Sequence, residues 1–466
     1  MLFNWKYGFR AAEVFWTAAP VILSLLRDWR RFFWFGRPYQ RSESDHQKRA
    51  LKIRTKLEHL GLVFIKVGQV ISSRGDLLPK TYLNELSKLQ DSVQPLPESL
   101  VCATLEAEYG QKLSSLFDEF SIKPIATASI GQVHHAVYKK RQVVVKFARP
   151  HIEMQLRRDS RTALLLLRIA ERSFKLLKIP ELVAVVSIYQ TIVGEISKGM
   201  LEEIDLRRER ENADRLATAV ADMKELVIPR TIPELCTNSV LSLEYITGTK
   251  VSDIELLTKQ GKDFKDVMNR LVAIYMRMIV VKGIYHADPH PGNIHVLPDG
   301  RILLFDFGIV RTLSEHTRQN LAKLVLSAIK KDLVTVVDQL YKLGIIAPSA
   351  DRETAIEVAR KVTSLHLQNL DTRQRVAEVA DTIYKAFKGF PLELPQELVY
   401  VFRCLSLLEG LGTRYRPGWN FIADGYPGIR AALTEYLVQS QGGWWNLFVG
   451  FLKDLFGSFV GKKTTP

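Results

Sequence analysis

The sequence is poor in cysteine, with only Cys102, Cys236 and Cys404 among 466 residues. These three lie far apart and form no metal-ligand spacing, which indicates no disulfide framework and fits a reducing compartment. Internal repeats and low-complexity tracts are also absent, and the first residues lack the pattern of a cleavable signal. With 47% hydrophobic residues, the chain is long enough for two or three domains with a sizeable core.

Long apolar runs are missing as well. The uncharged run from Val14 to Leu26 is shorter than the roughly 20 residues that a membrane-spanning helix needs, and it contains Pro20. Residues 1–44 instead interleave many aromatic residues with arginines, a pattern typical of a segment lying in the headgroup region of a bilayer. The alternative is a helix packed on the protein's own surface.

The other end of the chain repeats this pattern. In residues 438–466, polar and small residues recur at intervals of three or four and form one narrow stripe on an otherwise aromatic and aliphatic helix. Lys462 and Lys463 follow, which suits anionic headgroups. We expect an amphipathic, membrane-associating segment; a buried terminal helix is the alternative.

The net charge of +15 is unevenly distributed. Residues 1–60 hold twelve Lys or Arg and five Asp or Glu, so they contribute +7 (12 − 5). Because no recognition-helix, zinc-finger or RNA-binding signature accompanies the charge, we expect no nucleic-acid partner. The neighbouring aromatic residues favour lipid, so we expect membrane association on the cytoplasmic side.

Three blocks lie between the two ends. Residues 45–120 are expected to be helical, and residues 121–250 contain short β-rich runs interrupted by a helical insert from about 151 to 215. Residues 251–437 are expected to be mostly helical around a polar motif.

This polar motif carries most of the chemical information. The string His286-Ala287-Asp288-Pro289-His290-Pro291-Gly292-Asn293 is followed by Asp306-Phe307-Gly308. Asp288, Asn293 and Asp306 are therefore separated by five (293 − 288) and eighteen (306 − 288) residues, an arrangement typical of phosphoryl transfer. Asn293 and Asp306 offer the oxygen ligands that Mg²⁺ prefers, and His286 is expected to brace the loop by hydrogen bonds.

The residues between the two strings predict a hairpin. Ile294 to Phe305 reads as strand, Asp-Gly turn and strand. Such a hairpin would place Asn293 and Asp306 side by side at its open end, where one metal ion can meet both.

Earlier in the chain, a β-branched run ends in Lys146, which a strand would place in a cleft near nucleotide phosphates. It follows the loop from Ala126 to Val133, which is built mainly of alanine and serine where a protein kinase has glycines. Such a loop is stiffer, and its Cβ atoms occupy space that glycine leaves open.

A lysine of this kind needs an acidic partner from a helix. Glu202, Asp205, Glu209 and Asn212 are spaced to share one helical face. Further on, Leu243 to Gly248 reads as a strand that ends in a turn, at the chain position of a hinge whose backbone would pair with adenine.

Together these motifs closely resemble the UbiB-type atypical kinases, also called AarF-domain kinases. The resemblance covers about residues 50–320 and includes two strings that ordinary kinases lack, Lys66-Val67-Gly68-Gln69 (KxGQ) and Glu203-Ile204-Asp205 (ExD). It implies an α+β, protein-kinase-like fold of two lobes, with a helical N-terminal extension that carries KxGQ and a mostly helical C-lobe.

The resemblance also implies roles for individual residues. Asp288 takes the place of the catalytic aspartate, Lys146 that of the phosphate-binding lysine with Glu209 as its partner, and Asn293 and Asp306 would hold Mg²⁺. The residues expected to bind ATP or ADP are Ala126, Thr127, Ala128, Ser129, Ile130, Gly131, Gln132, Val133, Lys146, Glu244 and Ile246.

The family-specific strings are expected to regulate the site. In this family the extension that carries Lys66 and Gln69 folds over the site and meets the ExD acids, Glu203 and Asp205. It would fill the space that a peptide substrate needs. No Ala-Pro-Glu-like end of an activation segment follows Asp306, so a polypeptide substrate is disfavoured on both counts.

We therefore expect a membrane-associated, Mg²⁺-dependent ATPase or atypical kinase that supports the biosynthesis of an isoprenoid quinone such as ubiquinone or plastoquinone, or of a related prenyl lipid. Its expected partners are membrane lipid, prenylated quinone precursors and quinone-biosynthesis enzymes, and a homodimer stays open. The alternatives are a small-molecule kinase and a nucleotide-binding, non-catalytic scaffold of a membrane enzyme complex.

Overall fold

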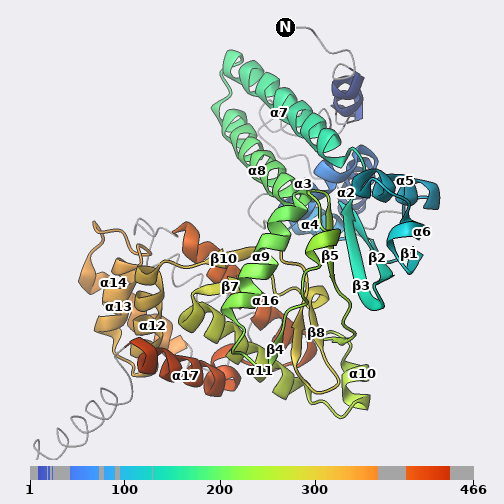
Figure 1. The fold of residues 1–466 in the computed structure, drawn as a ribbon. Coiled ribbons are helices and arrows are strands. Elements are labelled where there is room, and N and C mark those ends of the chain that lie inside the picture. Colours follow the sequence, from blue (N-terminus) through green and yellow to red (C-terminus); the bar gives the residue numbers. More distant parts are fainter. Residues whose placement is uncertain are drawn as a thin grey trace, which may run out of the picture. The chain divides into compact units, whose positions relative to one another are not determined.

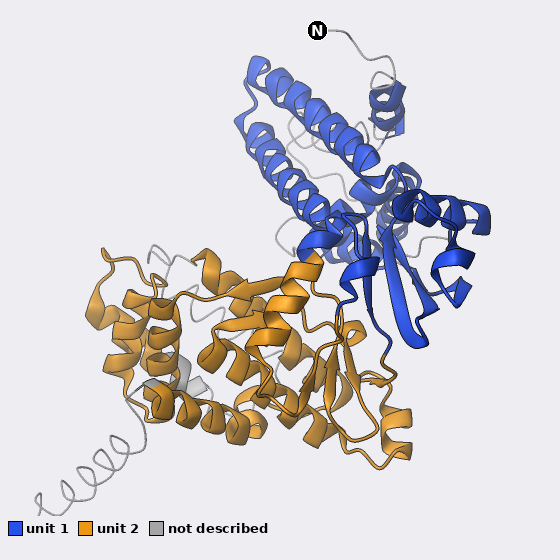
Figure 2. Ribbon diagram, viewed as in Figure 1, with its two compact units in different colours: residues 1–208, 231–245 blue, residues 209–230, 246–466 orange. Residues whose placement is uncertain are grey.

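The computed structural model describes residues 9–17, 19–20, 24, 42–72, 78–89, 95–127, 130–365 and 395–440 (Figure 1). Most of the predicted N-terminal segment and nearly all of the C-terminal one lie outside these residues. The chain forms two compact units, unit 1 with residues 1–208 and 231–245 and unit 2 with residues 209–230 and 246–466 (Figure 2). None of the helices in the described part combines the length and apolar character that crossing a bilayer requires.

A four-stranded antiparallel sheet forms the centre of unit 1. Its spatial order is β1-β2-β3-β5. Alternate residues of β3, including Val143, Val145 and Phe147, are buried in a cluster with Val101 and Leu105 of a helix that covers this face. The strands are β1 Glu119–Thr127, β2 Gly131–Tyr138, β3 Arg141–Ala148 and β5 Val240–Glu244.

Helices surround this sheet in unit 1. Two of them, α7 and α8, run side by side as a long antiparallel pair (Figure 1). The base of this pair shares a buried cluster with α3. The helices are α2 Glu43–Leu60, α3 Leu62–Ser72, α4 Lys80–Leu86, α5 Glu98–Tyr109, α6 Leu113–Leu116, α7 Ile152–Leu176, α8 Pro180–Ile204 and the short 3₁₀ helix η1 Pro233–Leu235.

Unit 2 contains two small sheets. One has the order β4-β9-β8-β6, and the other pairs β10 with β7. They are embedded in helices, of which α11 is the most deeply buried. The strands are β4 Leu226–Val227, β6 Thr249–Lys250, β7 Ile284–His286, β8 Ile294–Val296, β9 Ile302–Leu304 and β10 Val310–Thr312.

Helix α9, which crosses from unit 1 into unit 2 at residue 209, begins the helical part of unit 2. Helix α17 packs closely on α11 at Gly428, where a Cβ atom would lie only 2.8 Å from the Cα of Ala273. The helices are α9 Leu206–Ala219, α10 Ile254–Lys259, α11 Phe264–Met276, the π-helical turn η2 Arg277–Lys282, η3 Pro291–Asn293, α12 Glu315–Ile329, α13 Leu333–Lys342, α14 Arg352–Leu365, α16 Gln396–Tyr415 and α17 Phe421–Ser440.

One glycine sets the close approach of β2 to β3. A Cβ at Gly131 would lie 2.4 Å from the carbonyl oxygen of Phe147, a backbone atom that cannot rotate away. We expect Gly131→Ala to lower the free energy of unfolding of unit 1 by about 1–3 kcal/mol, measured by urea denaturation. The control is Gly194→Ala in α8, where the added methyl group meets no atom within 4 Å. This control should gain about 0.5–1 kcal/mol, and equal stability of the two variants would contradict the assignment.

Candidate functional site

The predicted hairpin between the two polar strings is present in unit 2. Ile294 of β8 pairs with Leu304 of β9, and the N–H of Phe305 donates to the carbonyl oxygen of Asn293 at 2.9 Å. Chain continuity then places Asn293 beside Phe305 and Asp306 at the open end of the hairpin. The expected hairpin is confirmed, and the meeting of one metal ion with both Asn293 and Asp306 stays a prediction.

The turn before β8 is organised by hydrogen bonds around Asp288. The N–H of His290 and the side-chain Nδ2 of Asn293 both donate to the carbonyl oxygen of Asp288, at 2.7 and 3.2 Å. Because Nδ2 donates this hydrogen bond, the amide oxygen of Asn293 points away from the Asp288 carbonyl group. Such an oxygen suits a hard cation. His290 accepts the N–H of Gly292 through Nδ1 at 3.2 Å, so it braces the same turn.

Asp306 has an unusual backbone conformation. Its φ of 59° lies in the left-handed region, which is uncommon for a residue other than glycine. Its side chain is exposed, and Oδ1 accepts the N–H of Gly308 at 3.2 Å. The next residue, Phe307, is fully buried, and its carbonyl oxygen accepts a hydrogen bond from Asn212 of α9 at 2.9 Å. A strained aspartate held between two anchored neighbours is typical of a ligand-binding position.

His286 connects the strand β7 to this aspartate. It is fully buried, and Nε2 lies 2.7 Å from the carbonyl oxygen of Asp306 and 3.1 Å from that of Phe305. Since carbonyl oxygens only accept, Nε2 carries the hydrogen, while Nδ1 lies 3.3 Å from the hydroxyl of Tyr275. Burial lowers the pKa of His286, which keeps the imidazole neutral. The expected bracing role is confirmed.

Helix α16 supplies contacts that sequence reasoning missed. Nη2 of Arg403 lies 3.4 Å from Oδ1 of Asp288, although 115 residues separate the two in the chain. On the same helix, Glu397 accepts hydrogen bonds from the hydroxyls of Thr317 and Ser314 at 2.6 and 3.1 Å. No local motif marks these residues, because a 20-residue helix with mixed polarity reads as an ordinary surface helix.

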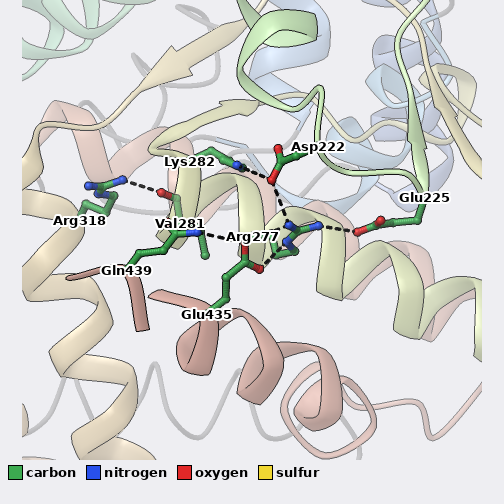
Figure 3. A network of polar contacts seen from close by, with 8 residues as sticks. All are labelled: Asp222, Glu225, Arg277, Val281, Lys282, Arg318, Glu435 and Gln439. Carbon is green, nitrogen blue, oxygen red and sulfur yellow. Dashed lines mark hydrogen bonds and ion pairs between the residues drawn. The ribbon is translucent and has the colours of Figure 1, made fainter. Parts of the chain in front are cut away.

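A cluster of charges holds the turn that precedes β7 (Figure 3). Arg277, the first residue of η2, donates to both carboxylate oxygens of Glu435 on α17, at 2.6 and 2.9 Å. It also contacts Glu225 at 2.9 Å and Asp222 at 3.4 Å, and Lys282 reaches Asp222 at 2.8 Å. The cluster therefore joins α17, the segment after α9 and the π-helical turn that leads into β7.

In unit 1, β3 carries Lys146 opposite Val133 of β2 and Leu241 of β5. Of the alanine-rich loop, Ala126 and Thr127 end β1 and Gly131 begins β2, whereas Ala128 and Ser129 lie outside the described residues. Ile130 is buried in the cluster that includes Leu62 and Phe64 of α3. The KxGQ helix thus packs against the residue that follows the loop tip.

Gln132, the second residue of β2, is another residue expected to bind the nucleotide. Its side chain is 1% exposed, and within the described part of the chain neither its Oε1 nor its Nε2 has a hydrogen-bond partner. Leaving a buried amide unpaired costs about 1–3 kcal/mol. Two unpaired polar atoms beside a predicted phosphate loop are compatible with a bound polar ligand.

The predicted continuous helix through the acids is wrong. Helix α8 ends at Ile204, and Asp205 has φ −75° and ψ 84°, so α9 starts anew at Leu206. The ψ of Asp205 lies outside the helical region, so the helix ends here although the 3.6-residue period of the sequence continues; the carboxylate of Asp205 pairs with the Arg208 guanidinium at 3.3 Å. Glu203 and Asp205 therefore belong to the end of α8, whereas Glu209 and Asn212 belong to α9.

Several predicted partners fall on different units. Lys146 is in unit 1 and Glu209, which is 4% exposed, is in unit 2, so their pairing stays a prediction. Glu244 and Ile246 stand on either side of the boundary at residues 245 and 246, where the hinge was expected. Gln69 donates to the carbonyl oxygen of Leu89 at 3.2 Å, and the meeting of Lys66 with the ExD acids stays a prediction.

The sequence matches the ABC1 atypical kinase-like domain over residues 88–340. It is 30% identical to the uncharacterized protein slr1919 of Synechocystis, over 92% of this chain and 73% of that one. It is 31% identical to the chloroplast protein ACTIVITY OF BC1 COMPLEX KINASE 7 of Arabidopsis thaliana, over 86% of this chain and 57% of that one. The chain thus spans between about half and three quarters of the length of these relatives.

Among solved structures, the chain resembles the complex of Rv3197 with erythromycin from Mycobacterium tuberculosis. The TM-score is 0.51 at 25% identity, over 80% of this chain and 96% of that one. Together with the domain match, this confirms the predicted α+β, kinase-like fold.

The neutral state of His286 predicts a pH dependence. Because its folded pKa lies below the ordinary value, its contribution to stability is present above about pH 6.5 and is lost as pH falls, by at most about 1.4 kcal/mol per pH unit. We expect His286→Gln to flatten this decline in urea unfolding between pH 7.5 and 5, with His295 responsible for part of the remainder. The exposed His59→Gln control should keep the full decline; an identical slope in both variants would contradict this role.

The charge cluster predicts a stability loss on removal of its centre. Arg277→Met would leave the carboxylates of Glu435, Glu225 and Asp222 without their shared cation. Because these groups are partly solvated, we expect a loss of about 1–3 kcal/mol, measured by thermal unfolding. Arg430→Met, an exposed arginine on α17, is the matched control and should change stability by less than about 0.5 kcal/mol.

Proposed function

The chain belongs to the ABC1 atypical kinase-like family, and we propose that it is a magnesium-dependent enzyme that transfers the γ-phosphoryl group of ATP to water or to a small molecule. We further propose that it works at a membrane in support of isoprenoid-quinone or related prenyl-lipid biosynthesis. The observation that carries the catalytic part is the hydrogen bond from the Phe305 N–H to the Asn293 carbonyl oxygen, which places Asp306 next to the turn that contains Asp288 and Asn293.

The donor set fits Mg²⁺. This cation keeps several waters, takes one or two protein oxygens and completes its shell with phosphate. The described residues contain no group of three or more His, Cys, Asp or Glu that could hold a metal alone. An amide oxygen from Asn293 and a carboxylate from Asp306 therefore match a cation that is bound together with a nucleotide.

The chemistry assigns one task to each residue. When bound, Mg²⁺ neutralises charge on the nucleotide phosphates. The oxygen of water or of the acceptor attacks the γ-phosphorus, the bond to the ADP oxygen breaks, and Asp288 takes the proton of the attacking group. Arg403, whose Nη2 lies 3.4 Å from Oδ1 of Asp288, would supply a permanent positive charge to the negatively charged transferred group. Lys146 and the backbone of the alanine-rich loop bind the phosphates.

The segment after Asp306 supports a small acceptor rather than a polypeptide. Strand β10 ends at Thr312 and α12 begins at Glu315, so only a short connection separates them. This connection is held by Glu397, and the Arg311 guanidinium lies 4.2 Å from the ring centroid of Tyr400, also on α16. A segment covered by a helix offers no extended edge to a peptide. The solved relative in complex with erythromycin also favours a small-molecule ligand.

The membrane part rests on the described portion of the N-terminal segment. Arg10 anchors residues 9–17 through two hydrogen bonds of 2.9 Å to the buried carboxylate of Asp159, and Val14 is buried. The aromatic residues Phe9, Phe15 and Trp16 are exposed. The segment therefore packs on the protein through one side while it presents aromatic rings, which suit a membrane interface, on the other.

ATP turnover tests the proposal. We expect purified protein to hydrolyse ATP in the presence of Mg²⁺, with stimulation by anionic liposomes or phenol-like quinone precursors. Asp306→Asn should lower turnover roughly 100-fold, because a charged metal ligand is lost. Asp299→Asn, at the exposed turn of the same hairpin, is the matched control and should retain turnover. Unchanged ATP hydrolysis by the Asp306→Asn protein would contradict the proposal.

The product and the genetics separate the alternatives. A phosphorylated small molecule formed in near one-to-one ratio with ATP consumed would identify a small-molecule kinase. Genetic rescue by Asp288→Asn, with turnover abolished, would favour a nucleotide-binding scaffold.

A further inference from the structure

The turn between α7 and α8 presents an unusually exposed apolar surface. Leu176 is 85% exposed, the highest value for a large apolar side chain in the described part of the chain, and the adjacent Leu177 is 64% exposed. Fully burying one such side chain is worth about 1.5–3 kcal/mol. Two neighbouring leucines at the end of a helical pair are therefore a costly feature for a surface that stays in water.

These leucines are held in an ordered turn. The N–H groups of Leu177 and Ile179 donate to the carbonyl oxygens of Ser173 and Phe174, each at 3.0 Å. Lys178 has φ +54°, a conformation that is unfavourable for a residue with a Cβ. The backbone is thus fixed so that both leucines face outward, and their exposure does not arise from a frayed helix end.

Basic residues surround the apolar tip. Residues 161–181 hold five Lys or Arg and two Asp or Glu, a net charge of +3 (5 − 2). Lys175 and Lys178 flank the two leucines directly, and Lys175 is paired with Glu171 at 2.5 Å. Further along α7, Leu165 and Ile169 are each 51% exposed and share a helical face with Leu176, at separations of four and seven residues.

We propose that the α7–α8 tip, defined as residues 172–180, inserts into the headgroup region of an anionic lipid bilayer. Leucines between lysines suit a bilayer, because the apolar side chains enter the acyl boundary while the ammonium groups stay among the phosphates. A protein partner is the weaker occupant, because the cores of protein interfaces are depleted in lysine. The exposed Phe15 and Trp16 lie on the segment that packs against the base of the same helix α7.

This inference deepens the membrane part of the proposed function and rests on it. It adds a third lipid contact to the two chain ends, one that belongs to the folded helical pair. It also assigns a task to the helical insert of unit 1, which the catalytic part of the proposal does not use.

Vesicle binding by the full chain tests the tip. Flotation should compare neutral phosphatidylcholine vesicles with vesicles that contain about one third phosphatidylglycerol. We expect Leu176→Ser combined with Leu177→Ser to weaken partitioning about tenfold or more. Met154→Ser is the matched control, because Met154 is 63% exposed on the same helix, about 33 Å away at 1.5 Å per residue. It should leave partitioning unchanged.

The lysines predict a lipid-specific effect. Lys175→Gln combined with Lys178→Gln should weaken binding about tenfold on anionic vesicles and much less on neutral ones. Lys139→Gln combined with Lys140→Gln, at the exposed turn between β2 and β3, is the control for lost charge in unit 1.

If the two chain ends alone are sufficient for vesicle binding, a local probe at the α7–α8 tip still shows whether the tip enters the bilayer. A polarity-sensitive dye at Leu177→Cys, in a chain with Cys102 and Cys236 replaced by serine, should shift to the blue on anionic vesicles. The same dye at Met154→Cys should not shift. An unshifted dye at position 177 in vesicle-bound protein overturns the proposal.

Two further readouts separate the remaining outcomes. If the leucine variant changes only the sedimentation of lipid-free protein, from an oligomer to a monomer, the tip is a protein interface and the proposal fails. ATP hydrolysis without vesicles should be the same in the leucine variant and the unaltered protein. Absent ATP hydrolysis in both would contradict the proposed catalytic function, while the dye would still report on the tip.

Discussion

The hydrogen bond from the buried His286 to the Asp306 carbonyl oxygen is the contact on which the candidate site of unit 2 depends. It joins β7, which leads to Asp288, to the hairpin that presents Asn293 and Asp306. Burial lowers the pKa of His286, so the ring stays neutral and keeps one donor and one acceptor in fixed places. The buried side chain of His286 therefore fixes the position of β7 relative to Asp306.

Contacts from distant parts of the chain hold β7 and the loop around Asp288 in position. The Arg277 cluster fixes the turn that enters β7, and it draws its carboxylates from elements far apart in the chain. Two residues of α16 contact the same region. Arg403 pairs with Asp288, and Glu397 accepts a hydrogen bond from the segment after Phe307. Helix α16 lies beyond the residues that match the family domain, so part of the surroundings of this loop comes from outside that domain.

Short-range patterns in the sequence predicted local structure well. The Asp-Gly turn, the β-branched run that ends in Lys146 and the strand before the hinge all occur where expected. The prediction failed at Asp205, where the backbone leaves the helical conformation although the periodicity of the neighbouring residues continues. Arg403, Glu397 and the Arg277 partners escaped prediction for a different reason, since their roles arise from contacts across 52 to 158 residues that no local pattern encodes.

The sequence indicated the kind of chemistry, because the residue types and spacings from His286 to Gly308 are typical of a phosphoryl-transfer site with oxygen ligands for a cation. It also determined the kinase-like class, since the order of the motifs along the chain is a one-dimensional property. Three features became visible only in the packed fold. His286 braces the loop through the Asp306 carbonyl oxygen, Arg403 pairs with Asp288, and Leu176 and Leu177 of the α7–α8 tip face outward. These depend on which side chains are buried together, and burial is a property of the packed fold.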